Sequence, residues 1–193
     1  MPPKFIARQR FVVNTKPNAR VKISGFGDNF QNWFLDLVED SASEVNLVPM
    51  VLDRAMFDHE IIAKLGGVTK VITALGEIFS LMAKQPEGPK SKAGQLRADG
   101  YANIFYVSQP VKKLADNRFS YVNLAGSETE EKVQDSQYLF ENNGQWYVLR
   151  AVRVLWYDYG WGVDASSVER PGRWDNGSQV FSRKILDPSF PCD

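Results

Sequence analysis

The chain has 193 residues, of which 44% are hydrophobic and 24% are charged, which is typical of a globular protein with a buried core. Its 23 basic and 23 acidic residues balance, so net charge alone points to neither a nucleic-acid nor a membrane partner. One cysteine and one histidine exclude a disulfide framework and argue against a Cys/His metal site. A Ser-His-Asp or Cys-His mechanism would require His59 itself, so we expect no metal, no cofactor and a role other than catalysis.

The location of the protein follows from what the sequence lacks. The N-terminal residues contain no apolar leader segment, and no run reaches the roughly 18 apolar residues of a membrane-spanning helix. The single Cys192 cannot form an internal disulfide, which argues against an oxidised, secreted scaffold. We therefore expect a cytoplasmic protein.

Charge is unevenly distributed along the first 60 residues. A basic arm comes first, and the segment 28–60 then holds many acidic residues against one basic residue, Arg54. Opposite charges attract, so we expect the arm to contact this acidic segment. The alternative is an arm that binds nucleic acid. The basic residues of the arm are Lys4, Arg8, Arg10, Lys16, Arg20 and Lys22.

Two helices are predicted in the N-terminal half. Apolar residues at helical spacing predict one helix over 28–39 and another over 68–85, directly after Gly66-Gly67. The segment 44–52 is typical of a strand. Pro49 within it indicates a sheet edge, because proline cannot donate a ladder hydrogen bond.

A hairpin and a linker border these helices. Runs rich in Val and Ile at 11–15 and 19–24 flank Lys16-Pro17-Asn18, which is typical of a hairpin turn. The segment 86–100 is rich in proline and glycine and poor in large apolar residues, so it is predicted as a linker or mobile loop. It would separate an N-terminal part, 1–85, from a C-terminal β part, 101–193, although the two parts could also form a single domain.

The C-terminal part is predicted to consist mainly of strands. Both faces of 145–157 are apolar, which favours a central strand covered on both sides, and Asn142-Asn143-Gly144 before it is a strong turn signal. The acidic segment 125–135 shows no periodicity and predicts an exposed loop or a short helix. The other strands are expected at 101–107, where Gln109-Pro110 ends the strand, and at 118–124, 137–141, 161–166 and 178–184. The sequence therefore predicts an α+β fold: a largely antiparallel sheet of five or more strands, with two helices packed toward the N-terminal half.

Three blocks of sequence carry a resemblance to known proteins: VKISGFGDNFQNWF at 21–34, ANIFYV at 102–107 and LRAVRVLWYDYGWGVDASSVERPGRWDNGSQVFSRK at 149–184. They resemble a loose set of small uncharacterised bacterial and phage-type proteins in which similar blocks recur. IIAKLGG, before the second predicted helix, also resembles that set. The chain departs from the set over 108–143, where the others have a short turn. No activity is known for the set, so the resemblance implies no functional residue.

Aromatic residues and arginines concentrate in the last strands and turns. Most of these rings are expected in the core, because aromatic side chains bury large areas, but Tyr159 and Trp174 lie in predicted loops and are expected to be exposed. With the usual catalytic sets missing, we expect a non-enzymatic binding or interaction protein whose partner is a protein. The residues predicted to bind are Tyr157, Tyr159, Arg170, Arg173 and Trp174.

Two other functions stay open. Nucleic acid could associate with the basic arm, with help from stacking on the aromatic loops. A carboxylate-dependent hydrolase could use Asp164 with Asp158 or Glu169, although turn and surface roles explain these acids better. Arg150 and Arg153, on opposite faces of one strand, could bind a phosphate or carboxylate, but we expect each to pair with an acid such as Asp164.

Overall fold

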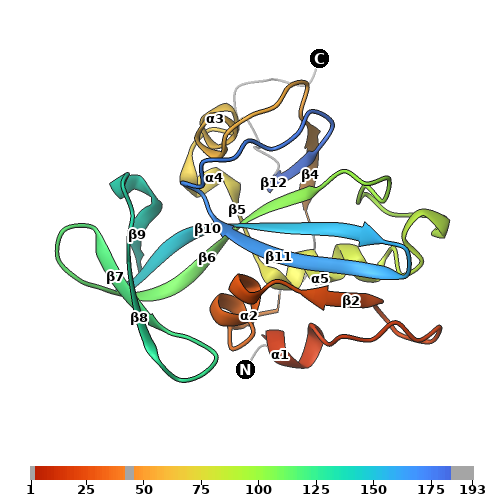
Figure 1. Ribbon diagram of the computed structural model, residues 1–193, viewed down its shortest axis with the longest axis horizontal. Helices are drawn as coiled ribbons and strands as arrows, with labels where there is room; N and C mark the ends of the chain where they lie inside the picture. The colour runs from red at the N-terminus through yellow and green to blue at the C-terminus, as the bar shows by residue number, and fades with distance from the viewer. Residues whose placement is uncertain (1–2, 42–45, 184–193) are drawn as a thin grey trace, which may run out of the picture.

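The computed structural model, described for residues 3–41 and 46–183, has an α+β fold whose α-helices all lie in the N-terminal half (Figure 1). The helices are α1 (Ala7–Arg10), α2 (Asp28–Phe34), α3 (Asp58–Lys64), α4 (Val68–Val71) and α5 (Leu75–Ala83), with 3-10 turns η1 (Gly88–Lys90) and η2 (Ser136–Tyr138). The strands are β1 (Lys4–Ile6), β2 (Ile23–Phe26), β3 (Val38–Asp40), β4 (Leu47–Val51), β5 (Ile72–Thr73), β6 (Asn103–Lys113), β7 (Arg118–Val122), β8 (Glu128–Lys132), β9 (Leu139–Asn142), β10 (Gln145–Tyr157), β11 (Gly160–Ser167) and β12 (Gln179–Arg183).

In the described residues, one mixed, mostly antiparallel sheet of ten strands follows the order β2-β11-β10-β6-β12-β4, with β5, β7, β8 and β9 attached beside this path. The predicted fold class is confirmed. None of the helices in the described ranges has both the length and the apolar character needed to cross a membrane.

The central strand is β10, which pairs antiparallel with β11 on one side and with β6 on the other. Its bounds match the predicted strand, and its two faces join different core clusters, as the apolar pattern indicated. Val152 and Val154 pack with residues of α2 and α5, whereas Leu149 and Ala151 pack with residues of α3 and α4. In Figure 1, α3 and α4 lie above the sheet and α1 and α2 lie below it. Each large apolar side chain buried in this way contributes about 1.5–3 kcal/mol.

Of the predicted edge strand and the predicted N-terminal hairpin, the structure confirms only the first in full. Strand β4 lies at the end of the sheet beside β12, with Pro49 opposite Phe181, so the predicted edge position is confirmed. The predicted hairpin at 11–24 is shorter than expected. Only a single bridge joins Asn14 to Ile23, because the second run continues into β2 and pairs parallel with β11 instead.

The basic arm contacts the acidic segment that follows it, as predicted. Strand β1 pairs antiparallel with β3, and Lys4 Nζ lies 2.6 Å from Asp40 Oδ1. Arg8 forms an ion pair with Asp36. The pairing of β1 with β3 also explains why the predicted helix over 28–39 ends at Phe34: residues 38–40 extend to form a strand rather than another helical turn.

The long helix predicted over 68–85 is wrong, because strand β5 interrupts it. Ile72 and Thr73 are β-branched and pair parallel with β6, where the Thr73 hydroxyl donates to the Tyr106 carbonyl at 3.1 Å. A new helix, α5, then begins. The Glu77 carboxylate accepts from Ala74 N at 2.8 Å, and Glu39 of β3 accepts from the next two amides of the turn. Carboxylates at a helix N-terminus are stabilising, so β3 anchors the start of α5.

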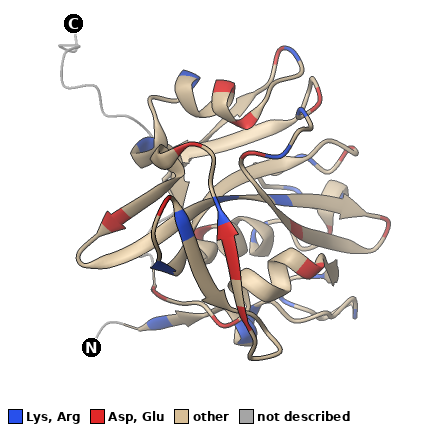
Figure 2. Ribbon diagram, turned by 60° about the vertical axis from the view of Figure 1, so that its left-hand side comes forward, with Lys and Arg blue, Asp and Glu red and all other residues tan. Residues whose placement is uncertain are grey.

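The segment 108–143 forms an arm of strands on the left of Figure 1. The predicted end of β6 at Pro110 is wrong. At Pro110 only β10 pairs with β6. No strand on the other side therefore needs a hydrogen bond from the N–H that proline lacks, and the strand continues. The prediction of a loop or helix over 125–135 is also wrong. Strand β8 pairs with β7, and its glutamates make the red strand at the centre of Figure 2. The predicted turn is confirmed, since Asn143 and Gly144 have φ of 50° and 77°.

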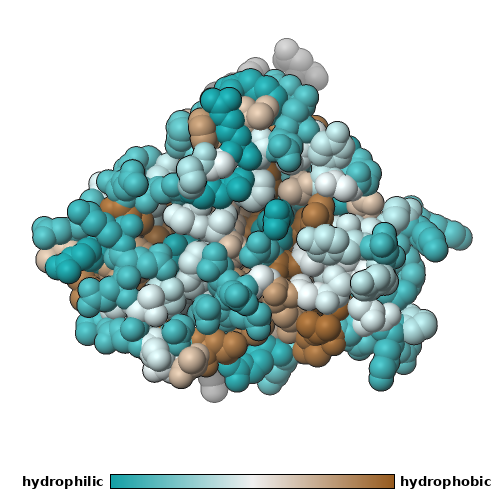
Figure 3. All heavy atoms as spheres, viewed as in Figure 1, coloured by the Kyte–Doolittle hydropathy of each residue, from teal (hydrophilic) through white to brown (hydrophobic). Residues whose placement is uncertain are grey.

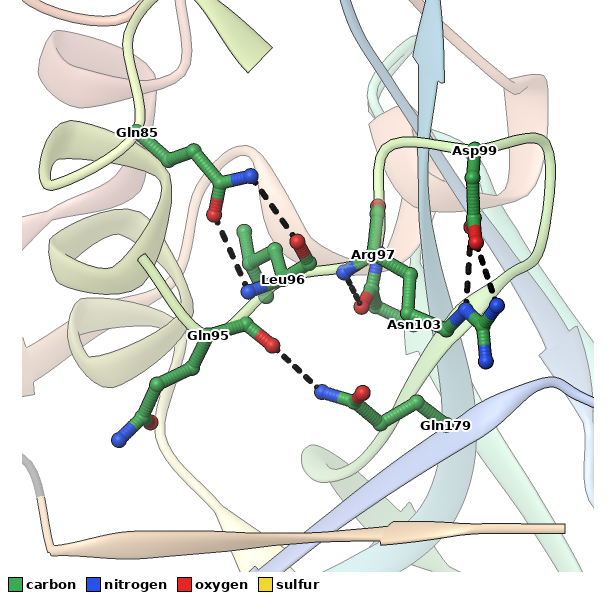
Figure 4. Close-up of polar contacts among 7 residues, drawn as sticks. All are labelled: Gln85, Gln95, Leu96, Arg97, Asp99, Asn103 and Gln179. Carbon is green, nitrogen blue, oxygen red and sulfur yellow. Dashed lines mark hydrogen bonds and ion pairs between the residues drawn. The ribbon is translucent and has the colours of Figure 1, made fainter. Parts of the chain in front are cut away.

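The segment 86–100 lies against the sheet through buried amides (Figure 4). The Gln85 side chain donates to Leu96 O at 2.9 Å and accepts from Leu96 N at 3.1 Å. Asn103 of β6 accepts from Arg97 N, and Gln179 of β12 donates to Gln95 O at 2.6 Å. Strands from both sides of this segment belong to the same sheet.

Candidate functional site

Both arginines of β10 pair with acids, as the sequence predicts. Arg150 is almost fully buried; its Nε donates to Gln109 Oε1 at 2.8 Å and its Nη2 to Glu131 Oε2 at 2.9 Å. Arg153 points to the opposite face and donates from Nη2 to Asp164 Oδ2 at 3.1 Å. The first arginine is therefore part of the scaffold, whereas the second lies where solvent can reach it.

The turn between β10 and β11 carries the two exposed tyrosines. Tyr157 is 49% exposed and Tyr159 is 65% exposed, so the predicted exposure of Tyr159 is confirmed. The Tyr157 ring lies so close to Gly162 that a Cβ at that position would come within 2.2 Å of it. These residues border a cavity of about 600 Å³, which we call the hairpin cavity, together with Arg153 and Asp164.

A smaller cavity of about 180 Å³, here called the arginine cavity, borders the same ion pair. Because Arg153 and Asp164 line both cavities, the two cavities are neighbours on one face of the β10–β11 hairpin. Tyr157 and Tyr159 therefore lie at one end of this surface, with Arg170 and Trp174 at the other. The residues that line the arginine cavity are Arg153, Asp164, Ala165, Ser166, Arg170 and Trp174.

Trp174 is buried rather than exposed, with 5% of its surface accessible, so that prediction is wrong. The loop that carries it folds back onto the chain before α3, where the Trp174 and Met56 backbones exchange hydrogen bonds of 2.8 and 3.1 Å. The indole Nε1 donates to Asp58 Oδ1 at 2.7 Å, which fixes the ring. The guanidinium carbon of Arg170 lies 3.8 Å from the ring centroid, in a cation–π contact.

Asp58 is the centre of this end of the site, and the sequence did not single it out. Its Oδ1 also accepts from the Tyr106 hydroxyl at 2.8 Å. Its Oδ2 lies 3.7 Å from Arg170 Nε, which is too long for a hydrogen bond. Within the described residues, Asp58 Oδ2 and the Nε and Nη2 of Arg170 are buried and have no hydrogen-bond partner. An unsatisfied buried polar group costs about 1–3 kcal/mol, so this cluster is under-satisfied.

Burial determines the protonation of the cluster. Loss of hydration raises the pKa of Asp58, against the opposing effect of the hydrogen bonds from Trp174 and Tyr106 and the charge of Arg170. Burial also raises the pKa of Tyr106 well above its ordinary value, and the neighbouring Asp58 adds to that shift. Tyr106 therefore stays a neutral hydrogen-bond donor to the carboxylate.

The last predicted binding residue, Arg173, is separate from both cavities. Its guanidinium carbon lies 4.5 Å from the centroid of the Phe57 ring, before α3. On that side a third cavity, of about 620 Å³, is lined in part by Phe57, His59, Glu169 and Arg170. The structure therefore brings together four of the five predicted residues and leaves Arg173 outside.

The candidate carboxylates have separate partners. Asp164 binds Arg153 and accepts from Ala165 N, whereas Glu169 accepts from the backbone amides of Gln134 and Asp135. Asp158 borders the hairpin cavity with Asp164. In the ranges 3–41 and 46–183, no three His, Cys, Asp or Glu side chains are grouped so that they could hold a metal ion.

Comparisons of the chain with protein-family models, curated proteins and solved structures return no match. The resemblance seen in the sequence therefore stays a prediction, and the function has to be argued from the site.

Proposed function

We propose that this chain is a non-enzymatic binding protein whose partner, a protein, contacts the face of the β10–β11 hairpin between Tyr159 and Arg170. The observation that carries the proposal is the pair of neighbouring cavities that share the Arg153–Asp164 ion pair and end in exposed tyrosines. The surface lies on the central hairpin of the sheet, which is a rigid support for recognition.

The chemistry of the surface suits a protein partner. Tyrosine and arginine are enriched at binding hot spots because they combine apolar contact area with hydrogen bonding. The face seen in Figure 3 is mainly hydrophilic, with separate brown patches rather than one continuous apolar area. On the hairpin face itself, the Arg153–Asp164 ion pair and the exposed Tyr157 and Tyr159 suit polar recognition with a few aromatic anchors better than a large hydrophobic interface. The single cysteine of the chain suits a reducing compartment, so the proposal places this binding in the cytoplasm.

The test begins with proteins that co-purify with the chain from its own host, each then purified and titrated against it by calorimetry. Replacement of both Tyr157 and Tyr159 by alanine should weaken the affinity for a genuine partner by tenfold or more, since hot-spot truncations cost about 2 kcal/mol of binding free energy. Val122→Ala is the matched control, because Val122 is 67% exposed on β7 and borders neither cavity of the site. Unchanged affinity of every partner for the double variant would refute the proposal.

The ion pairs of the basic arm favour a structural role for it over a nucleic-acid site. Besides the pairs of Lys4 and Arg8, Lys22 Nζ lies 2.6 Å from Glu87 Oε1. Half of the predicted arm cations therefore already have acidic partners within the chain.

A further inference from the structure

The two arginines of the arginine cavity both have hydrogen-bonding capacity to spare. Arg153 donates one hydrogen bond, from Nη2 to Asp164, although a guanidinium group carries five N–H donors. Asp164 Oδ1 accepts from Ala165 N at 2.8 Å, and its Oδ2 accepts the single hydrogen bond from Arg153. The other donors of Arg153 have no hydrogen-bond acceptor among the described residues and can face a ligand in the cavity.

Arg170 is held by stacking rather than by hydrogen bonds. The Trp174 ring supports its guanidinium plane, but its Nε and Nη2 have no acceptor within reach among residues 3–41 and 46–183. Buried donors in folded proteins are nearly always satisfied by protein, water or a ligand. Because no hydrogen bond from the described part of the chain fixes this guanidinium, it can turn over the ring toward an acceptor that enters the cavity.

The shape and charge of the cavity define which acceptor fits it. A forked guanidinium matches the two oxygens of a carboxylate or phosphate, and two such groups line this cavity together with the Ser166 side chain. A volume of about 180 Å³ admits only a small group, since a water molecule occupies about 30 Å³ of liquid. The charges that face this region are Arg153, Arg170, Asp164 and, behind Arg170, Asp58.

We propose that Arg153 and Arg170 bind a single oxyanion, a carboxylate or phosphate group, in the arginine cavity. This inference rests on the proposed function, because the oxyanion would belong to the partner that covers the hairpin face. Tyr157 and Tyr159 would then contact the apolar part of the partner in the hairpin cavity, while the two arginines take its anionic group.

The test is an NMR titration of the whole chain with inorganic phosphate and, separately, with acetate, at constant ionic strength. The Nε–Hε signals of Arg153 and Arg170 should shift and saturate at millimolar ligand, whereas that of Arg150, whose Nε already donates to Gln109, should not move. Chloride at matched ionic strength should give no saturable shift. Tighter binding of acetate would assign a carboxylate as the natural group, and tighter binding of phosphate would assign a phosphate.

Three variants complete the test. Arg153→Gln and Arg170→Gln should each raise the dissociation constant by tenfold or more, because a charged, forked donor pair is lost. Arg173→Gln is the matched control; it removes a neighbouring arginine that stacks on Phe57 outside the cavity, and it should bind as the wild type does. Arg153 is half-exposed, so its variant should fold even if the Arg170 variant does not.

The outcomes separate the anion site from the proposed function. Chemical shifts that do not saturate, or that change equally for all arginines, would overturn the oxyanion site. So would an Arg173→Gln variant that loses as much anion affinity as the Arg153 and Arg170 variants. If the site failed in this way while alanine at Tyr157 and Tyr159 still abolished partner binding, the binding function would stand without it.

Discussion

Arg150 and Arg170 both stack on a tryptophan, but they differ in their hydrogen bonds. The guanidinium carbon of Arg150 lies 3.7 Å from the centroid of Trp33, and that of Arg170 lies 3.8 Å from Trp174. Arg150 also donates to a glutamine and a glutamate within 3 Å. The nearest acid to Arg170, Asp58, stays 3.7 Å away.

The difference separates a scaffold residue from a binding residue. Arg150 extends from the central strand β10 and reaches β6 and β8, so its hydrogen bonds join three strands of the sheet. Arg170 comes from a loop and lies at the wall of two cavities, where unsatisfied donors can reach a ligand. Stacking on an aromatic ring does not distinguish the two roles; the state of the hydrogen bonds does.

The largest expected effect is on folding stability, and it tests the scaffold side of this comparison. Arg150→Ala should lower the free energy of unfolding by about 3–5 kcal/mol, because it leaves Glu131 and Gln109 without their buried partner. Arg170→Ala should cost only about 1–2 kcal/mol, since it removes a cation–π contact and no hydrogen bond. Urea denaturation monitored by circular dichroism gives both values. An Arg170 variant as unstable as the Arg150 variant would contradict the distinction.

A smaller effect is expected at the ring that supports Arg170. Trp174→Phe keeps an aromatic surface but loses the Nε1 donor to Asp58, and Tyr106→Phe removes the other donor to the same oxygen. Each should lower the free energy of unfolding by about 1–3 kcal/mol, because a buried acceptor loses a partner. Chemical denaturation measures this. A cost below about 0.5 kcal/mol for Trp174→Phe, typical of an exposed side chain, would instead favour the exposed tryptophan that the sequence predicted.

The features that could be predicted from sequence are those set by local patterns. The sequence predicts strand β10 with its observed bounds because the Asn143-Gly144 turn is followed directly by a run that is apolar on both faces. The ion pair of Arg153 with Asp164 was also predictable, since the two residues face each other across a short hairpin. The helix over 68–85 failed because its apolar spacing is equally compatible with burial of Ile72 and Thr73 in a strand beside β6.

The centre of the site could not be predicted, because its contacts are distant in sequence. Asp58 lies 48 positions from Tyr106 and 116 from Trp174, and a single aspartate at the first position of a helix matches no motif. Strand β8 was missed for a related reason. Its glutamates look like a solvated loop until β7 lies beside them, where Ser120 donates to Glu128 and Tyr121 to Glu131.

The last prediction concerns pH and tests whether Asp58 and Arg170 form a firm ion pair. Burial raises the pKa of Asp58 from its ordinary value of 3.8, so the folded chain binds more protons at this group than the unfolded chain does. The contribution of Asp58 to stability should therefore fall as pH rises from 3.8 through the folded-state pKa. Asp58→Asn keeps an acceptor for Trp174 and Tyr106 but cannot titrate.

The difference in unfolding free energy between this variant and the wild type should shift in favour of asparagine between about pH 3 and pH 7. Urea denaturation across that range measures it. Glu39, whose pKa burial also raises, titrates in both chains, so its effect cancels in the difference. If the wild type instead became more stable relative to the variant as pH rises, the charge of Arg170 and the hydrogen bonds would outweigh burial and hold the pKa of Asp58 below its ordinary value. Arg170 would then be a satisfied scaffold residue like Arg150, with no donors left for a ligand.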